Sequence, residues 1–283
     1  MDIKQVFSTN VRRIIVESYN LCNRKCFMCP QSLNLRPKQY IEFPTEQFTR
    51  LLNDLKQINY SETFAFGRYH EPLMFIDITL QRIQQVRETL PDANILLNTN
   101  GDYLNTGMLK YLSEAGLSEL KIMRYQESAY SDSEAERLCS ETIDKLGLIA
   151  VEKSTQEGVV TKYRFKCIGN MKVSMKSENY LVPMRGCDRG GLLKQIDNYK
   201  RSLPCDVPMK NLDVDYNGNI LPCNNLLSDA PQHQPYVIGN LGDISIFEAY
   251  MRSLDSAFTK RLQVGDFSYD QICQKCSYFY HTV

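Results

Sequence analysis

Residues 22–29 read Cys-Asn-Arg-Lys-Cys-Phe-Met-Cys and place three thiols on one short segment, in the spacing C-x3-C-x2-C. The apolar run Ile14-Ile15-Val16 precedes this segment and predicts a β-strand. Three thiolates on one loop can hold three corners of a 4Fe–4S cluster, because soft sulfur ligands suit iron. The fourth iron would then keep an open coordination position, at which a small molecule could bind and react.

Two other roles are open to Cys22, Cys26 and Cys29. A structural zinc site needs four ligands, usually supplied as two pairs, so a fourth ligand would have to come from far along the chain. A disulfide framework fits less well, because the first residues lack the apolar segment of a secretion signal and three clustered thiols cannot all pair with one another. The spacing of the thiols after a predicted strand therefore favours the iron–sulfur site.

The composition of the 283 residues gives the chain no strong net electrostatic field. Lys and Arg together number 33, as do Asp and Glu, so no net charge would attract nucleic acid or an anionic membrane surface. No apolar run approaches the length that spans a bilayer. Ten cysteines without a secretion signal indicate metal ligation in a reducing compartment. We therefore expect a cytoplasmic protein that binds neither nucleic acid nor membrane.

Strand and helix patterns alternate through the first half of the chain. Short apolar runs predict strands over residues 14–17, 63–66, 95–97 and 120–123. Helical spacing of apolar residues predicts helices over residues 45–55, 78–90, 106–115 and 133–146, with Thr45 as the N-cap of the first. These repeated units predict an α/β fold with a parallel sheet, a partial (β/α) TIM-like barrel whose functional residues gather at the carboxyl ends of the strands. Cys139 and Cys167 lie on apolar faces of a predicted helix and a predicted strand, so we expect both in the core.

The loop that carries Cys22, Cys26 and Cys29 resembles the signature of the radical S-adenosylmethionine (radical SAM) superfamily. In that superfamily three cysteines ligate a 4Fe–4S cluster, and the methionyl amine and carboxylate of S-adenosylmethionine (SAM) chelate the fourth iron. Met28 stands where the superfamily usually has an aromatic residue, and its thioether can cover an adenine face by dispersion. The resemblance therefore implies the three cysteines as iron ligands and Met28 as a cofactor contact.

The segment after the second predicted strand, Gly67-Arg68-Tyr69-His70-Glu71-Pro72, is similar to the superfamily motif that binds the methionyl amine. The resemblance implies Glu71 as the anionic partner of that amine. His70 stands where the motif usually has a glycine, and it could as well be a loop histidine that points into solvent.

The ends of the third and fourth predicted strands also match places where the superfamily contacts its cofactor. Asn98, Thr99 and Asn100 carry short amide and hydroxyl side chains that suit the hydroxyls of a ribose. Arg124 could meet a carboxylate of the cofactor or substrate, and a solvated arginine is the alternative.

A second array of cysteines, Cys205, Cys223, Cys273 and Cys276, lies near the end of the chain. Asn217-Gly218 between two short apolar runs predicts a β-hairpin with a type I′ turn, which would carry Cys223 just beyond its second strand. Four thiols suit either a tetrahedral zinc ion or a fully ligated iron–sulfur cluster. The array resembles the Twitch appendage, a shortened SPASM domain found behind many radical SAM barrels, and this resemblance implies an auxiliary 4Fe–4S cluster. We expect a radical SAM domain over residues 1–184 and an auxiliary-cluster domain over residues 185–283.

Residues 187–192, between the two arrays, read Cys-Asp-Arg-Gly-Gly-Leu. They resemble the arginine–glycine–glycine element of Twitch-containing aminocyclitol dehydrogenases, in which the arginine region borders the substrate. The resemblance implies Arg189 as a substrate contact, and a glycine-rich linker between domains is the alternative. Cys187 is a spare thiol beside this element, so it is a candidate hydrogen-atom donor or a buried structural cysteine.

The resemblance also implies the chemistry. A reduced cluster cleaves SAM to methionine and a 5′-deoxyadenosyl radical, which takes a hydrogen atom from an unactivated C–H bond of the substrate. In an oxidation the substrate radical passes one electron to the auxiliary cluster, whereas in an epimerisation of a sugar or a peptide Cys187 returns a hydrogen atom. We expect oxidation of a sugar or aminocyclitol, as in antibiotic biosynthesis, with a flavodoxin- or ferredoxin-type electron donor.

Two further classes of function are open at this point. A peptide maturase usually carries an extra N-terminal recognition domain, and the 21 residues before Cys22 are too few for one. A cluster-bearing sensor or a structural zinc protein would not cleave SAM.

Overall fold

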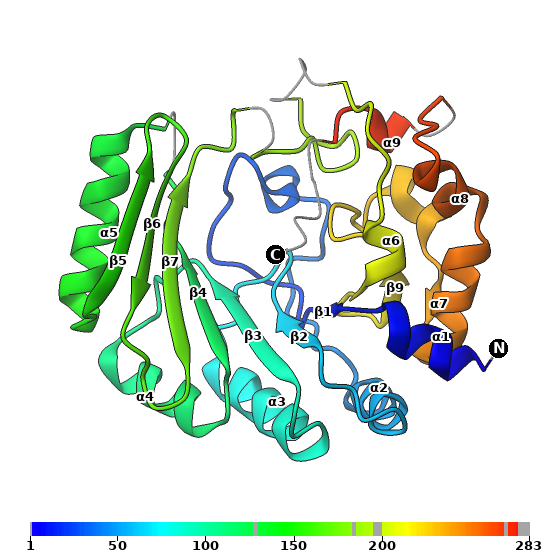
Figure 1. Cartoon of the computed structure of the whole chain (residues 1–283), viewed down its shortest axis with the longest axis horizontal. Coiled ribbons are helices and arrows are strands. Elements are labelled where there is room, and N and C mark those ends of the chain that lie inside the picture. Colours follow the sequence, from blue (N-terminus) through cyan, green and yellow to red (C-terminus); the bar gives the residue numbers. More distant parts are fainter. Residues whose placement is uncertain (1, 127–129, 183–184, 195–199, 269–270, 277–283) are drawn as a thin grey trace.

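The computed structural model of the chain describes residues 2–126, 130–182, 185–194, 200–268 and 271–276. One sheet runs through this part of the chain in the strand order β10-β9-β8-β1-β2-β3-β4-β7-β6-β5 (Figure 1). Its strands are β1 (Arg13–Val16), β2 (Thr63–Phe66), β3 (Asn94–Thr99), β4 (Glu119–Met123), β5 (Ala150–Gln156), β6 (Val160–Phe165), β7 (Lys172–Glu178), β8 (Asn211–Val214), β9 (Asn219–Leu221) and β10 (Gly239–Asn240). The six central strands β8, β1, β2, β3, β4 and β7 are parallel to one another. The outer strands on either side pair antiparallel, and the free edges at β5 and β10 leave the barrel open. The predicted α/β class is confirmed.

Helices alternate with the parallel strands as the sequence predicts, and α3 packs against β3 while α5 packs against β6 and β7. The helices are α1 (Ile3–Asn10), α2 (Thr45–Lys56), α3 (Ile76–Thr89), α4 (Thr106–Glu114), α5 (Asp132–Leu146), α6 (Val207–Lys210), α7 (Ile246–Asp255), α8 (Ala257–Gln263) and α9 (Gln271–Gln274), with 3₁₀ turns η1 (Pro30–Leu33) and η2 (Pro231–Tyr236). Helices α1, α7 and α8 form a group beside β8 and β9 at one end of the sheet (Figure 1). In the described chain, no helix is both long and apolar enough to cross a bilayer.

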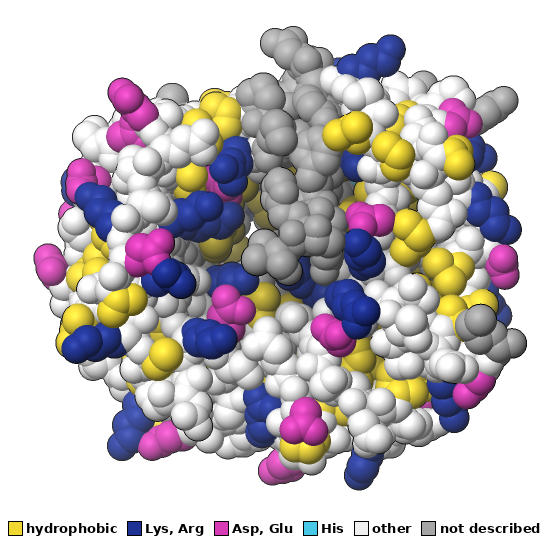
Figure 2. Space-filling model, viewed as in Figure 1, with side chains coloured by type: hydrophobic (Ala, Val, Ile, Leu, Met, Phe, Trp, Pro, Cys, Tyr) yellow, Lys and Arg dark blue, Asp and Glu magenta, His cyan; other side chains and the backbone are white. Residues whose placement is uncertain are grey.

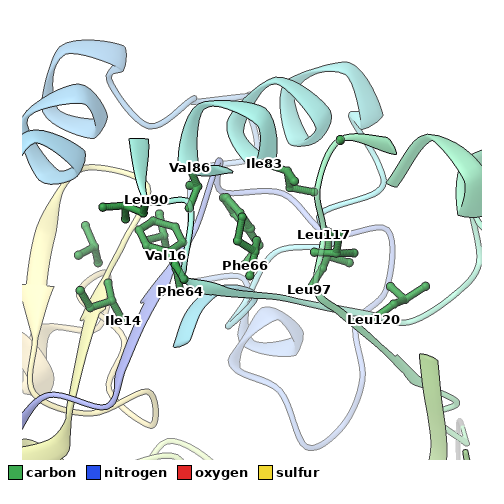
Figure 3. Packing of buried hydrophobic residues seen from close by; sticks show 14 of the residues in the cluster. Ile14, Val16, Phe64, Phe66, Ile83, Val86, Leu90, Leu97, Leu117 and Leu120 are labelled. Atoms are coloured by element: carbon green, nitrogen blue, oxygen red, sulfur yellow. The ribbon is translucent and has the colours of Figure 1, made fainter. Parts of the chain in front are cut away.

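The main hydrophobic core lies between the sheet and its helices. Figure 3 shows part of it, including Ile14, Val16, Phe64, Phe66, Ile83 and Val86. Because successive side chains of a strand point to opposite faces, the residues between these strand positions form a separate small cluster of Ile15, Ala65 and Leu96. The strand register places these three side chains next to one another. The face away from the helices therefore carries little apolar surface and can accommodate a polar site.

Three local predictions meet different outcomes. Thr45 is the first residue of α2 and makes no capping bond, so the predicted N-cap is wrong; Pro44 holds that position. Cys139 is fully buried, as predicted. Cys167 is exposed, and its prediction as a core residue is wrong because β6 ends at Phe165, after which the chain leaves the sheet.

The predicted hairpin between β8 and β9 forms, but its turn is not type I′. The N–H of Gly218 donates to the carbonyl of Asp215, and the N–H of Asp215 donates to the carbonyl of Asn219. Gly218 has a φ of +79°, whereas Asn217 is not in the left-handed region that a type I′ turn requires at both central residues. The Asp215 carboxylate also accepts from the N–H groups of Asn217 and Asn219 (2.8 and 2.9 Å), which stabilises a three-residue loop instead.

The two predicted domains contribute to one sheet, because β8 pairs with β1 in a parallel ladder from Arg13↔Asn211 to Val16↔Val214. The boundary predicted between residues 184 and 185 adjoins residues outside the described chain and stays a prediction. Figure 2 shows basic and acidic side chains interspersed on the face in view, in keeping with the balanced composition.

Candidate functional site

The carboxyl ends of the parallel strands line a cavity of about 100 Å³ that is partly open to solvent. Its walls include all three thiols of the first array and every predicted cofactor contact except Arg124: Cys22, Cys26, Met28, Cys29, Glu71, Asn98, Thr99 and Asn100. Tyr69, Tyr125, Tyr180 and Arg189 complete the described wall together with Arg24 and residues 67, 68 and 70. The structure thus brings together residues from loops after β1, β2, β3 and β4, as barrel geometry predicts.

Glu71 joins the end of β2 to the end of β3. Its carboxylate accepts hydrogen bonds from the Thr99 hydroxyl (2.5 Å) and from the N–H groups of Asn100 (2.8 Å) and Leu73 (3.1 Å). Burial raises the pKa of Glu71, and these hydrogen bonds act in the opposite direction. Two carboxylate oxygens offer about four lone-pair positions, so the group can accept one further donor such as a ligand ammonium.

Two contacts of its own residues hold the three-cysteine loop in place. The N–H of Cys29 donates to the carbonyl of Cys26 (2.9 Å), and Arg24 forms an ion pair with Asp102 (2.5 Å) beyond the end of β3. Burial raises the pKa of the Cys22 thiol to about 12 and that of Cys26 to about 11. At neutral pH the free thiols are therefore protonated, and a bound metal would supply the positive charge that stabilises the thiolates.

His70 connects the segment after β2 to the segment after β1 by hydrogen bonds. It is only 5% exposed, so the alternative of a histidine that points into solvent is wrong. Its Nδ1 lies 2.8 Å from the carbonyl oxygen of Gly67, and its Nε2 accepts from the N–H of Ser18 (3.3 Å). Burial lowers the pKa of His70 to about 4, which keeps the ring neutral with one nitrogen donating and the other accepting.

A buried ionic network lies under the same loops, and sequence reasoning did not find it. Arg36 makes a two-point contact with the Glu17 carboxylate (2.7 and 3.1 Å) and reaches Asp229 (3.1 Å). Arg68 lies 3.7 Å from Glu17 and 3.5 Å from Asp213. Burial by itself would raise the pKa of Glu17, but the two arginines outweigh it and hold the pKa below its ordinary value. The network fixes the ends of β1, β2 and β8 relative to one another.

At the end of β4, Tyr125 lines the cavity, whereas the predicted residue Arg124 does not. Arg124 donates to the carbonyl of Asn100 (2.8 Å) and lies 3.3 Å from Asp102, so it braces the end of β3. Tyr125 lines the cavity and its ring lies 5.8 Å from that of Tyr180. Tyr125 stands within the motif that sequence reasoning selected, but no sequence signal distinguished it from Arg124. The cofactor role predicted for Arg124 stays a prediction.

The four thiols of the second array, Cys205, Cys223, Cys273 and Cys276, line one small pocket whose other walls are mostly apolar. Four thiols at the walls of one pocket can supply the four ligands of an iron–sulfur cluster. Burial raises the pKa of Cys223 well above its ordinary value.

Arg189 connects the two cavities. Its guanidinium donates to the carbonyl of Met28 (3.3 Å) and to the side-chain oxygen of Asn225 (2.7 Å), and it lies 5.8 Å from the centre of the Tyr69 ring. Cys187 lines neither of these two cavities, and its thiol instead donates to Asn225 (3.0 Å).

The glycine beside Arg189 fits its place closely. Gly190 has a φ of +66°, and a Cβ there would lie 2.6 Å from Nε2 of His233. That same ring nitrogen bonds the carbonyl of Gly190 (2.8 Å), and Nδ1 accepts from the N–H of Leu227 (2.9 Å). The Arg-Gly-Gly segment is thus held against the second pocket, which argues against a free linker.

The structure combines a mostly parallel sheet, a three-cysteine loop after β1 and a second pocket lined by four cysteines. Residues 205–277 match the family model of SPASM, described as an iron–sulfur cluster-binding domain. Both findings agree with the resemblance predicted from the cysteine arrays.

Comparison with individual proteins extends the likeness to almost the whole chain. The chain is 25% identical over 269 residues to the S-adenosyl-L-methionine-dependent 2-deoxy-scyllo-inosamine dehydrogenase of Niallia circulans, which covers 93% of this chain and 92% of the relative. The crystal structure of BtrN in complex with AdoMet and 2-DOIA matches with a TM-score of 0.67 and 23% identity, over 94% of this chain and 92% of that one. The same protein in an open conformation matches with a TM-score of 0.60 and 21% identity over the same shares. The predicted fold and the predicted resemblance are confirmed.

Proposed function

We propose that this chain is a radical SAM dehydrogenase that oxidises a hydroxyl group of a sugar or an aminocyclitol. The cofactors would be SAM and two 4Fe–4S clusters, one in each cavity. The name of the Niallia circulans relative supports an aminocyclitol as the substrate class. We further assign a cytoplasmic location and a flavodoxin- or ferredoxin-type protein as the electron donor.

The observation that carries the proposal is the position of Arg189. Its guanidinium reaches the loop of the first cysteine array through Met28 and the pocket of the second array through Asn225. A substrate bound in the first cavity next to Arg189 would lie between the two clusters. An oxidation needs that arrangement, because a hydrogen atom leaves on one side and an electron on the other.

When bound, the cofactors would supply the one-electron chemistry that removes the hydrogen atom of the carbinol carbon, the hydroxyl proton and one electron from the substrate. Cys22, Cys26 and Cys29 would hold the first cluster, and Cys205, Cys223, Cys273 and Cys276 the second. Glu71 would accept the methionyl ammonium with its remaining lone pair. The rings of Tyr69, Tyr125 and Tyr180 line the cavity beside Arg189, which would orient the substrate hydroxyl.

Oxidation agrees better with the position of Cys187 than epimerisation does. A thiol that returns a hydrogen atom must reach the substrate radical, whereas the Cys187 thiol donates to Asn225 and does not line the first cavity. The structural role left open for Cys187 is therefore the one that we propose.

The proposed function is tested with the anaerobically reconstituted full chain, SAM, a reductant and a panel of cyclitols and aminocyclitols that begins with 2-deoxy-scyllo-inosamine. We expect 5′-deoxyadenosine and a product that has lost two hydrogens, with deuterium from the carbinol carbon recovered in 5′-deoxyadenosine. A variant with Cys22, Cys26 and Cys29 changed to alanine should form neither product. Cys139→Ala is the matched control, because Cys139 is buried and lines neither cavity.

Two results would overturn the proposal. Iron-loaded protein that leaves SAM intact would exclude radical SAM chemistry. A product of unchanged mass that contains deuterium from heavy water would show epimerisation instead of oxidation.

A further inference from the structure

Asn225 contacts two of the four thiols in the second pocket. It lies two residues after Cys223, is 4% exposed and lines the pocket itself. Its backbone N–H donates to the Cys223 sulfur (3.5 Å), and its side-chain Nδ2 donates to the Cys276 sulfur (3.6 Å). A single residue thus directs N–H groups toward sulfur atoms from two distant parts of the chain.

The orientation of the Asn225 amide is fixed by its other contacts. The side-chain oxygen accepts from Nη1 of Arg189 (2.7 Å) and from the Cys187 thiol (3.0 Å). An arginine can only donate hydrogen bonds, so the oxygen of the amide must face Arg189 and the NH₂ group must face Cys276. The charge of Arg189 also polarises the amide and strengthens the N–H donor on its far side.

Hydrogen bonds to the sulfur ligands of an iron–sulfur cluster favour its reduced state, because that state carries one more negative charge. We propose that Asn225 is a positioning residue that raises the reduction potential of the auxiliary cluster and links that cluster to Arg189. This inference rests on the proposed function, because it requires a 4Fe–4S cluster in the second pocket. It assigns to Asn225 the tuning of the electron acceptor.

A purely structural role for Asn225 leads to a different expectation. If the side chain only held the loop after β9, its replacement would lower cluster occupancy or the free energy of unfolding. The potential of the clusters that do assemble would stay the same. The measurement must therefore report the potential of loaded protein and not turnover.

The experiment uses the full chain with Cys22, Cys26 and Cys29 changed to alanine, so that only the auxiliary cluster gives a signal. In this background Asn225→Leu removes the side-chain donor, and Asn225→Asp removes it while keeping an oxygen for Arg189 and adding a negative charge. Each protein is reconstituted anaerobically, its iron and sulfide are counted, and its midpoint potential is read by electron paramagnetic resonance (EPR) during a reductive titration. Asn211→Leu is the matched control, because Asn211 is 1% exposed and is not among the residues that line the second pocket.

For Asn225→Leu we expect the ratio of reduced to oxidised cluster at a fixed potential to fall about tenfold, a shift of about 59 mV toward lower potential for a one-electron couple. Asn225→Asp should shift the potential further in the same direction, and Asn211→Leu should leave it unchanged. The electron–nuclear coupling of the exchangeable side-chain proton near Cys276 should disappear in both Asn225 variants, whereas that of the backbone N–H near Cys223 should remain.

The outcomes separate this inference from the proposed function. Variants at Asn225 that load fully with iron and titrate at the parent potential would overturn the inference and leave the proposed function intact. A parent protein that binds zinc and no iron in the second pocket would overturn both. If Asn225→Leu does not bind an auxiliary cluster, the potential of Asn225→Asp tests the inference instead. This variant keeps an oxygen that can accept the hydrogen bond of Arg189, and a potential equal to that of the parent would overturn the inference.

Discussion

Acidification should destabilise the protein through His70, and the size of the effect follows from its burial. The pKa of His70 is lowered by burial to about 4, against 6.5 for an unperturbed histidine. The unfolded chain therefore binds more protons than the native protein between these values, so the free energy of unfolding rises with pH across that window. At 1.36 kcal/mol per pKa unit, about 2 kcal/mol is lost between pH 8 and pH 5, with a limit of about 3.4 kcal/mol below pH 4.

The variant His70→Gln removes the titrating group and isolates its contribution. Glutamine stays neutral at every pH, so the pH-dependent part of the loss should disappear. A pH-independent cost of about 1–3 kcal/mol should remain, because the N–H of Ser18 or the carbonyl of Gly67 loses its buried partner. His233 is also buried, and its lowered pKa contributes equally to both proteins and cancels in the difference.

The assay is urea unfolding of both proteins, prepared with the same metal content, at pH 8, 7, 6 and 5. The wild-type protein should lose about 2 kcal/mol more than the variant over this range. Parallel loss in the two proteins would show that His70 is not neutral and buried in the native state. That result would refute its assignment as the brace between the loops after β1 and β2.

Two other substitutions test the site. Arg36→Met should lower the free energy of unfolding by about 3–5 kcal/mol because it leaves the Glu17 carboxylate buried without its main partner, whereas Arg12→Met, in an exposed ion pair, should cost less than about 1 kcal/mol; equal losses in urea unfolding would contradict the buried network. Cys187→Ala should keep both the cleavage of SAM and the oxidised product in mass spectrometry, and a variant that loads both clusters yet loses its product would instead favour a hydrogen-donor role.

The elements and the cysteine sites were predictable because their signals are local. Strand β2 has the predicted bounds, Thr63–Phe66, since its apolar run is short and bounded by polar residues. The thiols of the first array, and the Cys273/Cys276 pair of the second, likewise lie within a few residues of one another. Helix α1 was not predicted because it buries Phe7 and no further residue, and strand β7 was not predicted because only two of its alternating buried residues, Val173 and Met175, are apolar.

The contacts that join distant segments were not predictable from a single sequence. Arg36 and Asp229 are 193 residues apart, and Arg189 and Asn225 are 36 residues apart, on two segments that no local pattern joins. Each of these side chains, considered alone, resembles an ordinary solvated residue. Their roles depend on which strand ends the sheet brings together, and no local pattern carries that information.

The pairing of β8 with β1 determines how the two cysteine arrays relate to each other. Strand β1 leads into the loop with Cys22, and the hairpin that begins with β8 leads to Cys223 two residues after β9. Because β8 pairs with β1 in a parallel ladder and with β9 in an antiparallel one, both arrays follow strands of a single sheet, and the Glu17, Arg68 and Asp213 side chains link the ends of β1, β2 and β8. The second pocket is therefore attached to the same sheet as the first cavity by strand pairing as well as by chain connection. The electron transfer between a substrate and the auxiliary cluster that we propose would depend on the separation that this pairing sets.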